Sequence, residues 1–389
     1  MAKAKIEPDE PEVEFDPNSC VKATQKANPG KHHNELDAIY HITSTGSLIW
    51  DIKLGGGLCP GLHRFLGPPE SGKTSAALEI CRNFLAVGGK RRGLYFKAEG
   101  RLSHEMKERC GLPFVEKIED WKDGTIYVVK SNIYEYCINL MRALIKGRKS
   151  PHLYCIIIDS TDGMILDADS LKTIDENAKV AGTPALTKKF LQSMANEMSE
   201  NGHLCLMLSQ YSSNIQLDTY AAAEDRRPKQ GGGGWGAAHF ANWAFEFLTG
   251  WNEHDILKNP DAKPGKDNER VGKKAVIKFK KTLNETTNST IEYPVKFKVI
   301  GGSSIWRSME VSALCLATGR IRRGGSWFNP SADFISEVKS AGATIPDKIQ
   351  GETKMNKWFE ENPKVCDILY ETLRQTLTSK GDANAFPKA

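Results

Sequence analysis

The segment Gly67–Thr74 reads GPPESGKT and matches the phosphate-binding P-loop pattern GxxxxGKT at every fixed position. The apolar segment Leu62–Leu66 just before it predicts a buried strand, and Ser75–Cys81 just after it has the composition and spacing of a helix. A strand, a glycine loop and a helix in this order let the backbone wrap an anion and point unpaired helix N–H groups at it. An ordinary glycine turn that opens a helix is the alternative interpretation. The complete match in this context favours the P-loop and an α/β fold.

The predicted loop also carries the side chains that phosphate chemistry requires. Lys73 adds a positive charge, and Thr74 offers its hydroxyl to a magnesium ion. The residues predicted to surround the phosphates are Gly67, Pro68, Pro69, Glu70, Ser71, Gly72, Lys73, Thr74 and Ser75.

Two acidic residues stand at the ends of predicted strands. Glu99 follows the strand Gly93–Lys97, where a carboxylate beside a P-loop can orient an attacking water molecule. A helix N-terminal acid is the structural alternative for this residue. Asp159 closes the apolar run Leu153–Ser160, whose continuous hydrophobicity indicates a central parallel strand. We expect Asp159 to hold magnesium together with Thr74.

A further predicted strand, His203–Ser209, ends at Gln210 and a long loop. A glutamine there can contact a γ-phosphate, although a polar strand cap explains it equally well. Residues 211–234 lack apolar periodicity but combine basic, aromatic and glycine residues, which suits contact with single-stranded nucleic acid. With two lysines outside the apolar stripe of the helix 184–200, the candidate DNA-binding residues are Lys188, Lys189, Tyr220, Arg226, Arg227, Lys229, Gly233 and Gly234.

The segment Lys274–Lys281 alternates apolar and basic residues and is predicted to pair with Tyr293–Ile300 as a hairpin. Lys280 and Lys281 lie at its turn end. From this position a cation can reach a phosphate or the nucleotide of a neighbouring subunit.

Length and composition predict a soluble protein of two or three domains. A chain of 389 residues is too long to fold around one ordinary hydrophobic core. Its composition, with 40% hydrophobic and 26% charged residues, is typical of globular proteins. No apolar run approaches the roughly twenty residues that span a bilayer, so we expect no membrane partner and a cytoplasmic location. Nine cysteines occur singly without a CxxC pair, which favours reduced, buried thiols.

The chain is predicted to contain four regions. Proline and charge near the start indicate a flexible or extended arm, residues 1–41, which we assign to oligomerisation. Residues 42–328 form the α/β core, residues 329–377 a small α-rich domain, and residues 378–389 a disordered tail.

The order of these features resembles the RecA-type homologous recombinases, including bacteriophage-encoded relatives, over most of residues 40–377. The most specific motifs are STGSLIWDIKLGGGLCPG before the P-loop, AEG, IIIDS, LSQ and ETKMNKWFEENPK. The resemblance implies a RecA-type core in which Glu99 and Lys73 are catalytic and Asp159 is the Walker B acid. Gln210 becomes a nucleotide sensor, Lys280 and Lys281 approach the adjacent subunit's ATP, and the DNA-binding loops are residues 162–183 and 211–234.

This resemblance implies an ATP- and Mg²⁺-dependent recombinase that hydrolyses ATP to ADP and phosphate when bound to DNA. It would form a head-to-tail helical filament on single-stranded DNA and exchange strands with homologous double-stranded DNA in recombination and repair. A single-strand-binding protein or a loading mediator would assist it. The alternatives are a non-catalytic mediator or paralogue and a ring-forming helicase of the same superfamily. Ser103 and Met106 replace the family's usual Asp and Tyr near the base.

Overall fold

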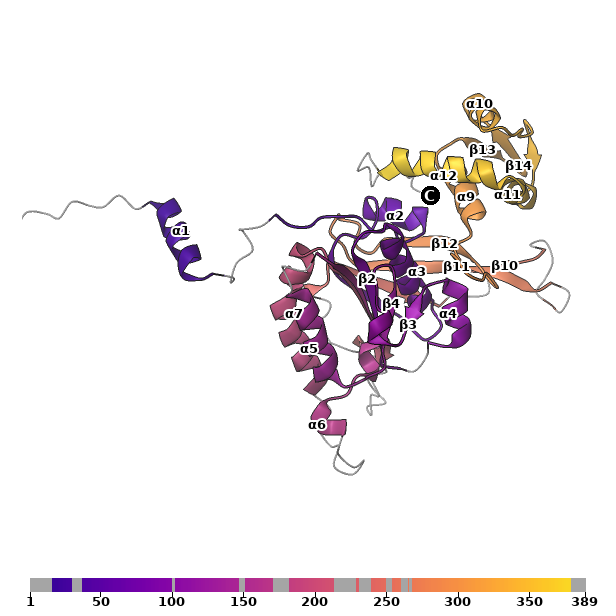
Figure 1. Cartoon of the computed structure of the whole chain (residues 1–389). Helices are drawn as coiled ribbons and strands as arrows, with labels where there is room; N and C mark the ends of the chain where they lie inside the picture. Colours follow the sequence, from indigo (N-terminus) through magenta and orange to yellow (C-terminus); the bar gives the residue numbers. More distant parts are fainter. Residues whose placement is uncertain are drawn as a thin grey trace, which may run out of the picture. The chain divides into compact units, whose positions relative to one another are not determined.

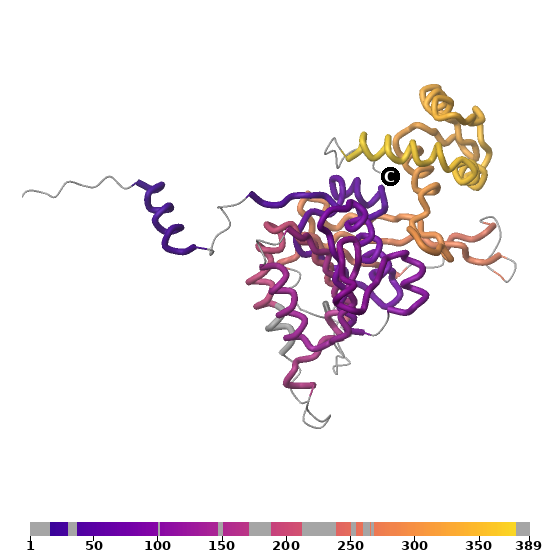
Figure 2. Tube along the Cα trace, viewed as in Figure 1, coloured from indigo at the N-terminus to yellow at the C-terminus, as the bar shows by residue number. Residues whose placement is uncertain are grey.

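The computed structural model describes residues 16–29, 37–99, 102–146, 151–170, 182–212, 229–230, 239–249, 254–259, 265 and 268–378, without the side chains of 182–187, 212 and 229–230. The chain divides into two compact units, Met1–Ala38 and Ile39–Ala389, each considered by itself. Figure 1 labels the elements, and Figure 2 traces the chain by residue number.

The first unit contains a helix, α1 Pro17–Ala27. Asp16 caps it, because its carboxylate accepts hydrogen bonds from the backbone N–H groups of Asn18 and Ser19 at 3.0 and 3.1 Å. Pro17 occupies the first helical position, where its missing N–H and fixed φ cost nothing. The alternative of an extended segment is therefore wrong for residues 17–27, whereas a flexible arm stays a prediction. The role of residues 1–41 in oligomerisation stays a prediction.

The second unit is built on a ten-stranded sheet in the order β10-β11-β9-β1-β6-β5-β2-β4-β3, with β12 paired to β11. All pairs from β3 to β9 are parallel, whereas β9, β10 and β12 pair with β11 in antiparallel fashion. The α/β fold with a mostly parallel central sheet is thus confirmed. The strands are β1 Gly61–Leu66, β2 Arg91–Lys97, β3 Phe114–Val115, β4 Ile126–Val129, β5 Leu153–Asp159, β6 Leu204–Ser209, β9 Trp243–Leu248, β10 Asp255–Leu257, β11 Arg270–Lys281 and β12 Thr290–Lys296.

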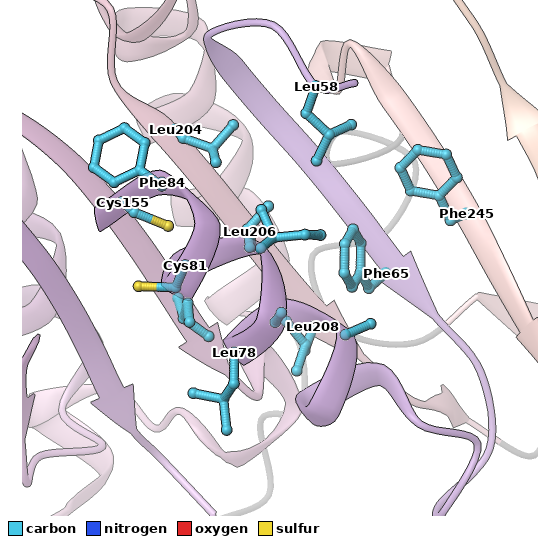
Figure 3. Close-up of a cluster of buried hydrophobic side chains, with 14 of the residues drawn as sticks. Leu58, Phe65, Leu78, Cys81, Phe84, Cys155, Leu204, Leu206, Leu208 and Phe245 are labelled. Atoms are coloured by element: carbon cyan, nitrogen blue, oxygen red, sulfur yellow. The ribbon is translucent and has the colours of Figure 1, made fainter. Parts of the chain in front are cut away.

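Helices cover both faces of this sheet (Figure 1). Along β5, Cys155 and Ile157 belong to one buried cluster while Ile156 and Ile158 belong to another, so successive side chains enter opposite cores. The first cluster includes side chains of α3 and is drawn in Figure 3; the second includes side chains of α5 and α7. The short helices and turns are α4 His104–Cys110, α6 Asp167–Ser170, η1 Ile118–Asp120 and η2 Thr161–Gly163, and the long helices are α3 Lys73–Ala86, α5 Tyr134–Ile145 and α7 Gly182–Glu200.

A third buried cluster lies toward the C-terminus, where α12 packs against α2 and α9 (Figures 1 and 2). It combines helices with a three-stranded antiparallel sheet that the sequence did not predict. The proposed boundary at residue 329 stays a prediction. The elements are α9 Arg307–Ala317, β13 Ile321–Gly324, β14 Trp327–Pro330, α10 Ala332–Ser340, β15 Ile349–Gln350, α11 Glu352–Glu361 and α12 Pro363–Thr378.

The helix α2 Leu48–Leu54 joins two of these clusters. Its Trp50 and Leu54 side chains enter the first cluster, and Leu48 and Ile52 enter the third. The alternation follows from helical spacing, which places these pairs on opposite faces of a short buried helix. The core and the C-terminal cluster therefore share one element.

Two buried acids are found at α2: Asp51 belongs to the helix, and Glu310 of α9 contacts its first turn. Asp51, 0% exposed, accepts hydrogen bonds from the backbone N–H and the hydroxyl of Thr45, both at 2.7 Å, and from the Ser44 hydroxyl. Glu310, also 0% exposed, accepts from the Ser47 hydroxyl and from the backbone N–H of Ile49 at 3.1 Å. Burial raises the pKa of Asp51 to about 6 and the pKa of Glu310 to about 7, and hydrogen bonds to each carboxylate oppose the rise.

We expect the free energy of unfolding to fall as pH rises through neutrality. The folded pKa of Glu310, about 7, lies above its ordinary 4.5, so the folded state binds this proton more tightly than the unfolded state. The effect of this group is at most about 3 kcal/mol, complete once pH exceeds the folded value. Glu310→Gln should flatten the fall between pH 6 and 7.5, which urea unfolding at several pH values measures.

The exposed Glu361 of α11 supplies the matched control. Glu361→Gln should keep the wild-type pH dependence. An equally steep fall in Glu310→Gln would show that Glu310 does not titrate in this window.

Candidate nucleotide site

The predicted P-loop connects β1 to α3, as the sequence indicated. Gly72 precedes the helix with φ of 95°, a left-handed conformation that glycine adopts without strain. At Gly67 the reason for glycine is space, because a Cβ there would lie 2.4 Å from the carbonyl oxygen of Phe247. The two glycines are thus required by backbone shape and by close packing against β9.

Lys73, at the start of α3, lies against this loop. Its Nζ donates to the carbonyl oxygens of Gly67 and Pro68, both at 2.7 Å, and lies 3.5 Å from Ser71 Oγ. The Ser71 hydroxyl in turn donates to the Pro68 carbonyl at 2.8 Å. The ammonium therefore sits beside the N-terminus of α3, where the helix dipole also favours an anion.

One pocket of about 690 Å³ gathers the predicted residues from separate elements. Lys73 and Thr74 come from the start of α3, Glu99 follows β2, Asp159 ends β5, and Gln210 follows β6. They meet because the carboxyl ends of parallel strands share one edge of the sheet. This edge is supported by the first buried cluster, which contains side chains of α3 and of the central strands. Figure 3 shows part of that cluster.

Asp159 joins three of these elements. Its Oδ2 accepts hydrogen bonds from Thr74 Oγ1 at 2.8 Å and from the Tyr95 hydroxyl at 2.6 Å. Burial raises the pKa of Asp159, and the hydrogen bonds from Tyr95 and Thr74 oppose that rise. A carboxylate beside a threonine hydroxyl provides the oxygen ligands that Mg²⁺ prefers, so this donor set fits the ion.

Glu99 and Gln210 are in direct contact, which sequence reasoning did not predict. Gln210 Nε2 donates to both carboxylate oxygens of Glu99 at 3.0 Å, and the Ser160 hydroxyl also donates to that carboxylate. The backbone N–H of Gln210 donates to Asp162 Oδ2 at 2.6 Å. One glutamine therefore binds the candidate base and the start of the predicted first DNA loop.

The other predicted residues lie elsewhere or beyond the described residues. Lys280 forms an ion pair with Glu246 at 3.4 Å, and Lys281 donates to the His239 carbonyl. Neither contributes to the pocket walls formed by the described residues. Lys188 and Lys189 are exposed on α7, and Lys229 lies in β8 Lys229–Gln230, which pairs with β7 Tyr211–Ser212. Outside the described residues are Tyr220, Arg226, Arg227, Gly233, Gly234, most of residues 171–183 and the tail from 379.

Two residues at or near the pocket, Arg109 and Tyr95, were not singled out from the sequence. Arg109 of α4 donates from Nη2 to Ser75 Oγ at 3.1 Å and lines the pocket with Met106. The end of α4 is hydrogen-bonded to the backbone of the segment before α9. The N–H groups of Gly301 and Gly302 donate to the carbonyls of residues 108 and 109 at 3.0 and 3.3 Å. Tyr95 was indistinguishable from a core aromatic in an apolar strand, and no local signal relates Arg109 to Ser75.

Together, the parallel sheet, the P-loop between β1 and α3 and the acid at the end of β5 define a RecA-type α/β core. No protein-family model matches the chain. Curated proteins named Protein RecA are similar to this chain over most of its length. The protein from Crocosphaera subtropica is 24% identical over 86% of this chain and 82% of its own length.

Other relatives give the same result. Protein RecA from Bifidobacterium breve is 22% identical over 89% of this chain and 76% of its own length. Protein RecA from Synechocystis sp. is 23% identical over 86% of this chain and 81% of its own length. The resemblance to the RecA-type recombinases is confirmed, whereas a bacteriophage origin stays a prediction. Among the described residues, no helix is long and apolar enough to cross a membrane, and the cytoplasmic location stays a prediction.

We expect Tyr95→Phe to weaken Mg²⁺ binding in the presence of nucleotide by about 10- to 100-fold, the usual effect of removing a group that orients a metal ligand. The reason is the lost hydrogen bond from the Tyr95 hydroxyl to Asp159 Oδ2. Titrating Mg²⁺ against a fluorescent ATP analogue measures the change.

Tyr154→Phe is the matched control, because this buried tyrosine of β5 belongs to the second cluster. It should leave the metal affinity unchanged. Equal affinities in wild type and Tyr95→Phe would contradict the role of Tyr95.

Proposed function

We propose that this protein is an ATP- and Mg²⁺-dependent DNA recombinase that binds single-stranded DNA and pairs it with homologous double-stranded DNA. The observation that carries the proposal is that Gln210, which lines the P-loop pocket, contacts both Glu99 and Asp162. It relates the candidate hydrolytic residue to the starts of both predicted DNA loops. Similarity to proteins named RecA supports the same function.

Hydrolysis assigns a separate task to each residue. A water molecule attacks the γ-phosphorus and the bond to the ADP oxygen breaks, while Glu99 accepts the proton of the water. Lys73 neutralises charge on the β- and γ-phosphates. Thr74 and Asp159 would hold Mg²⁺, which would stabilise the charge that develops on the phosphate oxygens. Tyr95 fixes the orientation of the Asp159 carboxylate.

Gln210 is suited to sense the nucleotide. Its amide N–H donates to the Glu99 carboxylate at 3.0 Å. A γ-phosphate is a competing acceptor, so contact with it draws the amide away from Glu99 and frees the carboxylate to bind water. The same displacement acts on residue 211 and the loop beyond it, which gives ATP a means of favouring the DNA-binding conformation.

Assembly and localisation complete the proposal. Head-to-tail contacts that do not close generate a helical filament, and Lys280 and Lys281 would approach the neighbouring subunit's ATP. DNA phosphates would be held by basic side chains, with a single-strand-binding protein or loading mediator assisting in the cytoplasm. A non-catalytic mediator is disfavoured because Lys73, Glu99 and Asp159 converge in one pocket. Electron microscopy of DNA complexes separates a filament from a helicase ring.

We expect Glu99→Gln to bind ATP normally but to hydrolyse it about 10²- to 10⁴-fold more slowly, because the general base is lost. ATP turnover with and without single-stranded DNA, together with binding of a fluorescent ATP analogue, measures both effects. Glu105→Gln, an exposed glutamate on α4, should retain wild-type turnover and DNA stimulation.

A folded Glu99→Gln protein that has lost ATP binding would assign Glu99 a structural role. Wild-type turnover that single-stranded DNA does not stimulate would contradict the proposed DNA-dependent activity.

Neutralising Arg226, Arg227 and Lys229 should weaken binding of single-stranded DNA and reduce the dependence of log affinity on log salt by about 0.7 for each lost phosphate contact. ATP binding without DNA should be unchanged. Fluorescence anisotropy of a labelled oligonucleotide, measured over a salt series with an ATP analogue, tests this expectation.

A triple variant at the exposed lysines Lys117, Lys122 and Lys146 controls for the loss of three positive charges. It should keep the wild-type slope. If the loop variant keeps it as well, residues 211–234 do not contact DNA phosphates, and Lys188, Lys189 and the first loop remain the candidates.

A further inference from the structure

An arginine is buried in the interior strand β1. Arg64 is 2% exposed and pairs in register with Met207 of β6 on one side and Ala244 of β9 on the other. A guanidinium in this environment requires polar partners, because transferring an unpaired charge from water is costly. Arg64 is the charged residue among the six residues of β1, GLHRFL, and its burial points to a specific task.

The partners of Arg64 belong to the starts of the two predicted DNA loops. Its Nε donates to Ser209 Oγ at 3.3 Å, at the end of β6. Burial lowers the pKa of Arg64, while attraction by Asp162 and Tyr211 opposes this change. Asp162 follows β5 at the beginning of residues 162–183, and Tyr211 begins residues 211–234.

These two starting points are also bonded to each other. Thr161 Oγ1 donates to the Leu208 carbonyl at 3.2 Å, and the backbone N–H of Gln210 donates to Asp162 Oδ2 at 2.6 Å. Asp162 thus attracts the charge of Arg64 and accepts the hydrogen bond from the Gln210 N–H. A displacement of Gln210 therefore alters the hydrogen bond to the Asp162 carboxylate, whose negative charge also attracts Arg64.

The contacts continue from Tyr211 to the neighbouring strands. The Tyr211 hydroxyl donates to the carboxylate of Glu246 in β9, and Glu246 pairs with Lys280 of β11 at 3.4 Å. Polar groups therefore run from the nucleotide pocket, past the beginnings of both loops, to a lysine outside that pocket. Buried hydrogen-bonded networks of this kind hold discrete arrangements better than isolated contacts do.

We propose that Arg64 is a positioning residue that couples nucleotide occupancy to DNA affinity by holding Ser209 and Asp162, at the beginnings of both DNA loops, in register with Gln210. The proposal rests on the proposed function, since it presumes that the loops bind DNA. Arg64 contacts neither ATP nor DNA in this scheme. It transmits the position of Gln210 to both loops at once, because the guanidinium fork serves several acceptors from one rigid group.

The test measures the affinity for a labelled oligo-dT strand with and without a non-hydrolysable ATP analogue. The ratio of the two affinities is the coupling between the sites. Arg64→Met should reduce this ratio by at least about fivefold, the lower end of ordinary coupling between sites. Affinity for the analogue without DNA should stay at the wild-type value. Arg64→Lys, which keeps the charge without the fork, should restore part of the ratio.

His63→Gln is the matched control. His63 is 0% exposed, adjacent on β1 and directed to the opposite face of the sheet, where its Nε2 contacts the Cys59 carbonyl at 2.8 Å. This change disturbs the same strand without touching either loop and should preserve the ratio. An equal loss in His63→Gln and Arg64→Met would overturn the proposal in favour of a general effect of the strand.

Other outcomes are equally decisive. A folded Arg64→Met protein with wild-type coupling overturns the role of Arg64. If circular dichroism shows that Arg64→Met is unfolded, Asp162→Asn is tested in its place. An undiminished ratio of DNA affinities with and without the analogue in that variant overturns the proposal. Reciprocity adds a second readout, because DNA must raise analogue affinity by the same factor. A wild-type protein with no nucleotide-dependent DNA binding would instead contradict the proposed function.

Discussion

The site depends on the two hydrogen bonds that Asp159 Oδ2 accepts, one from Thr74 and one from Tyr95. They connect the first turn of α3, the end of β5 and the middle of β2. Burial raises the pKa of Asp159, and the same two bonds oppose that rise by favouring the charged form. These bonds fix the start of α3, the end of β5 and the middle of β2 relative to one another, and the proposed Mg²⁺ site depends on that arrangement.

Local sequence was sufficient for much of the fold. The P-loop, the strands that end at Asp159 and Gln210, and the long helices follow from periodicity and glycine placement, because each signal lies within one element. The helix α1 was not expected, since proline and charge obscured an Asp16 cap followed by a proline at the first helical position. The aromatic strand β9 was also missed, because its pairing partners β1 and β11 are distant in sequence. The C-terminal sheet was missed although β13 and β14 form a local hairpin, because the glycines between them indicated only a break.

The candidate site was predictable as a set of residues but not as a network. Parallel topology explains why Lys73, Glu99, Asp159 and Gln210 share an edge. Nothing local indicates that Gln210 contacts Glu99, that Arg109 contacts Ser75, or that Arg64 is buried in contact with Ser209. These contacts depend on side-chain directions across strands, which are fixed only when the sheet is assembled.

The contact between α4 and the backbone of Gly301 and Gly302 has a consequence for how this family of pockets can diverge. One wall of the nucleotide pocket is anchored by main-chain hydrogen bonds, while the neighbouring Ile300 side chain is 81% exposed. Residues on the outer side of that wall can change without altering the width of the pocket. Met106 and Arg109 line the pocket, and substitutions at these positions leave the P-loop residues that also line it unchanged. Substitutions at these two positions therefore change one wall of the pocket without changing the P-loop Gly67–Thr74, which lies in a different part of the chain.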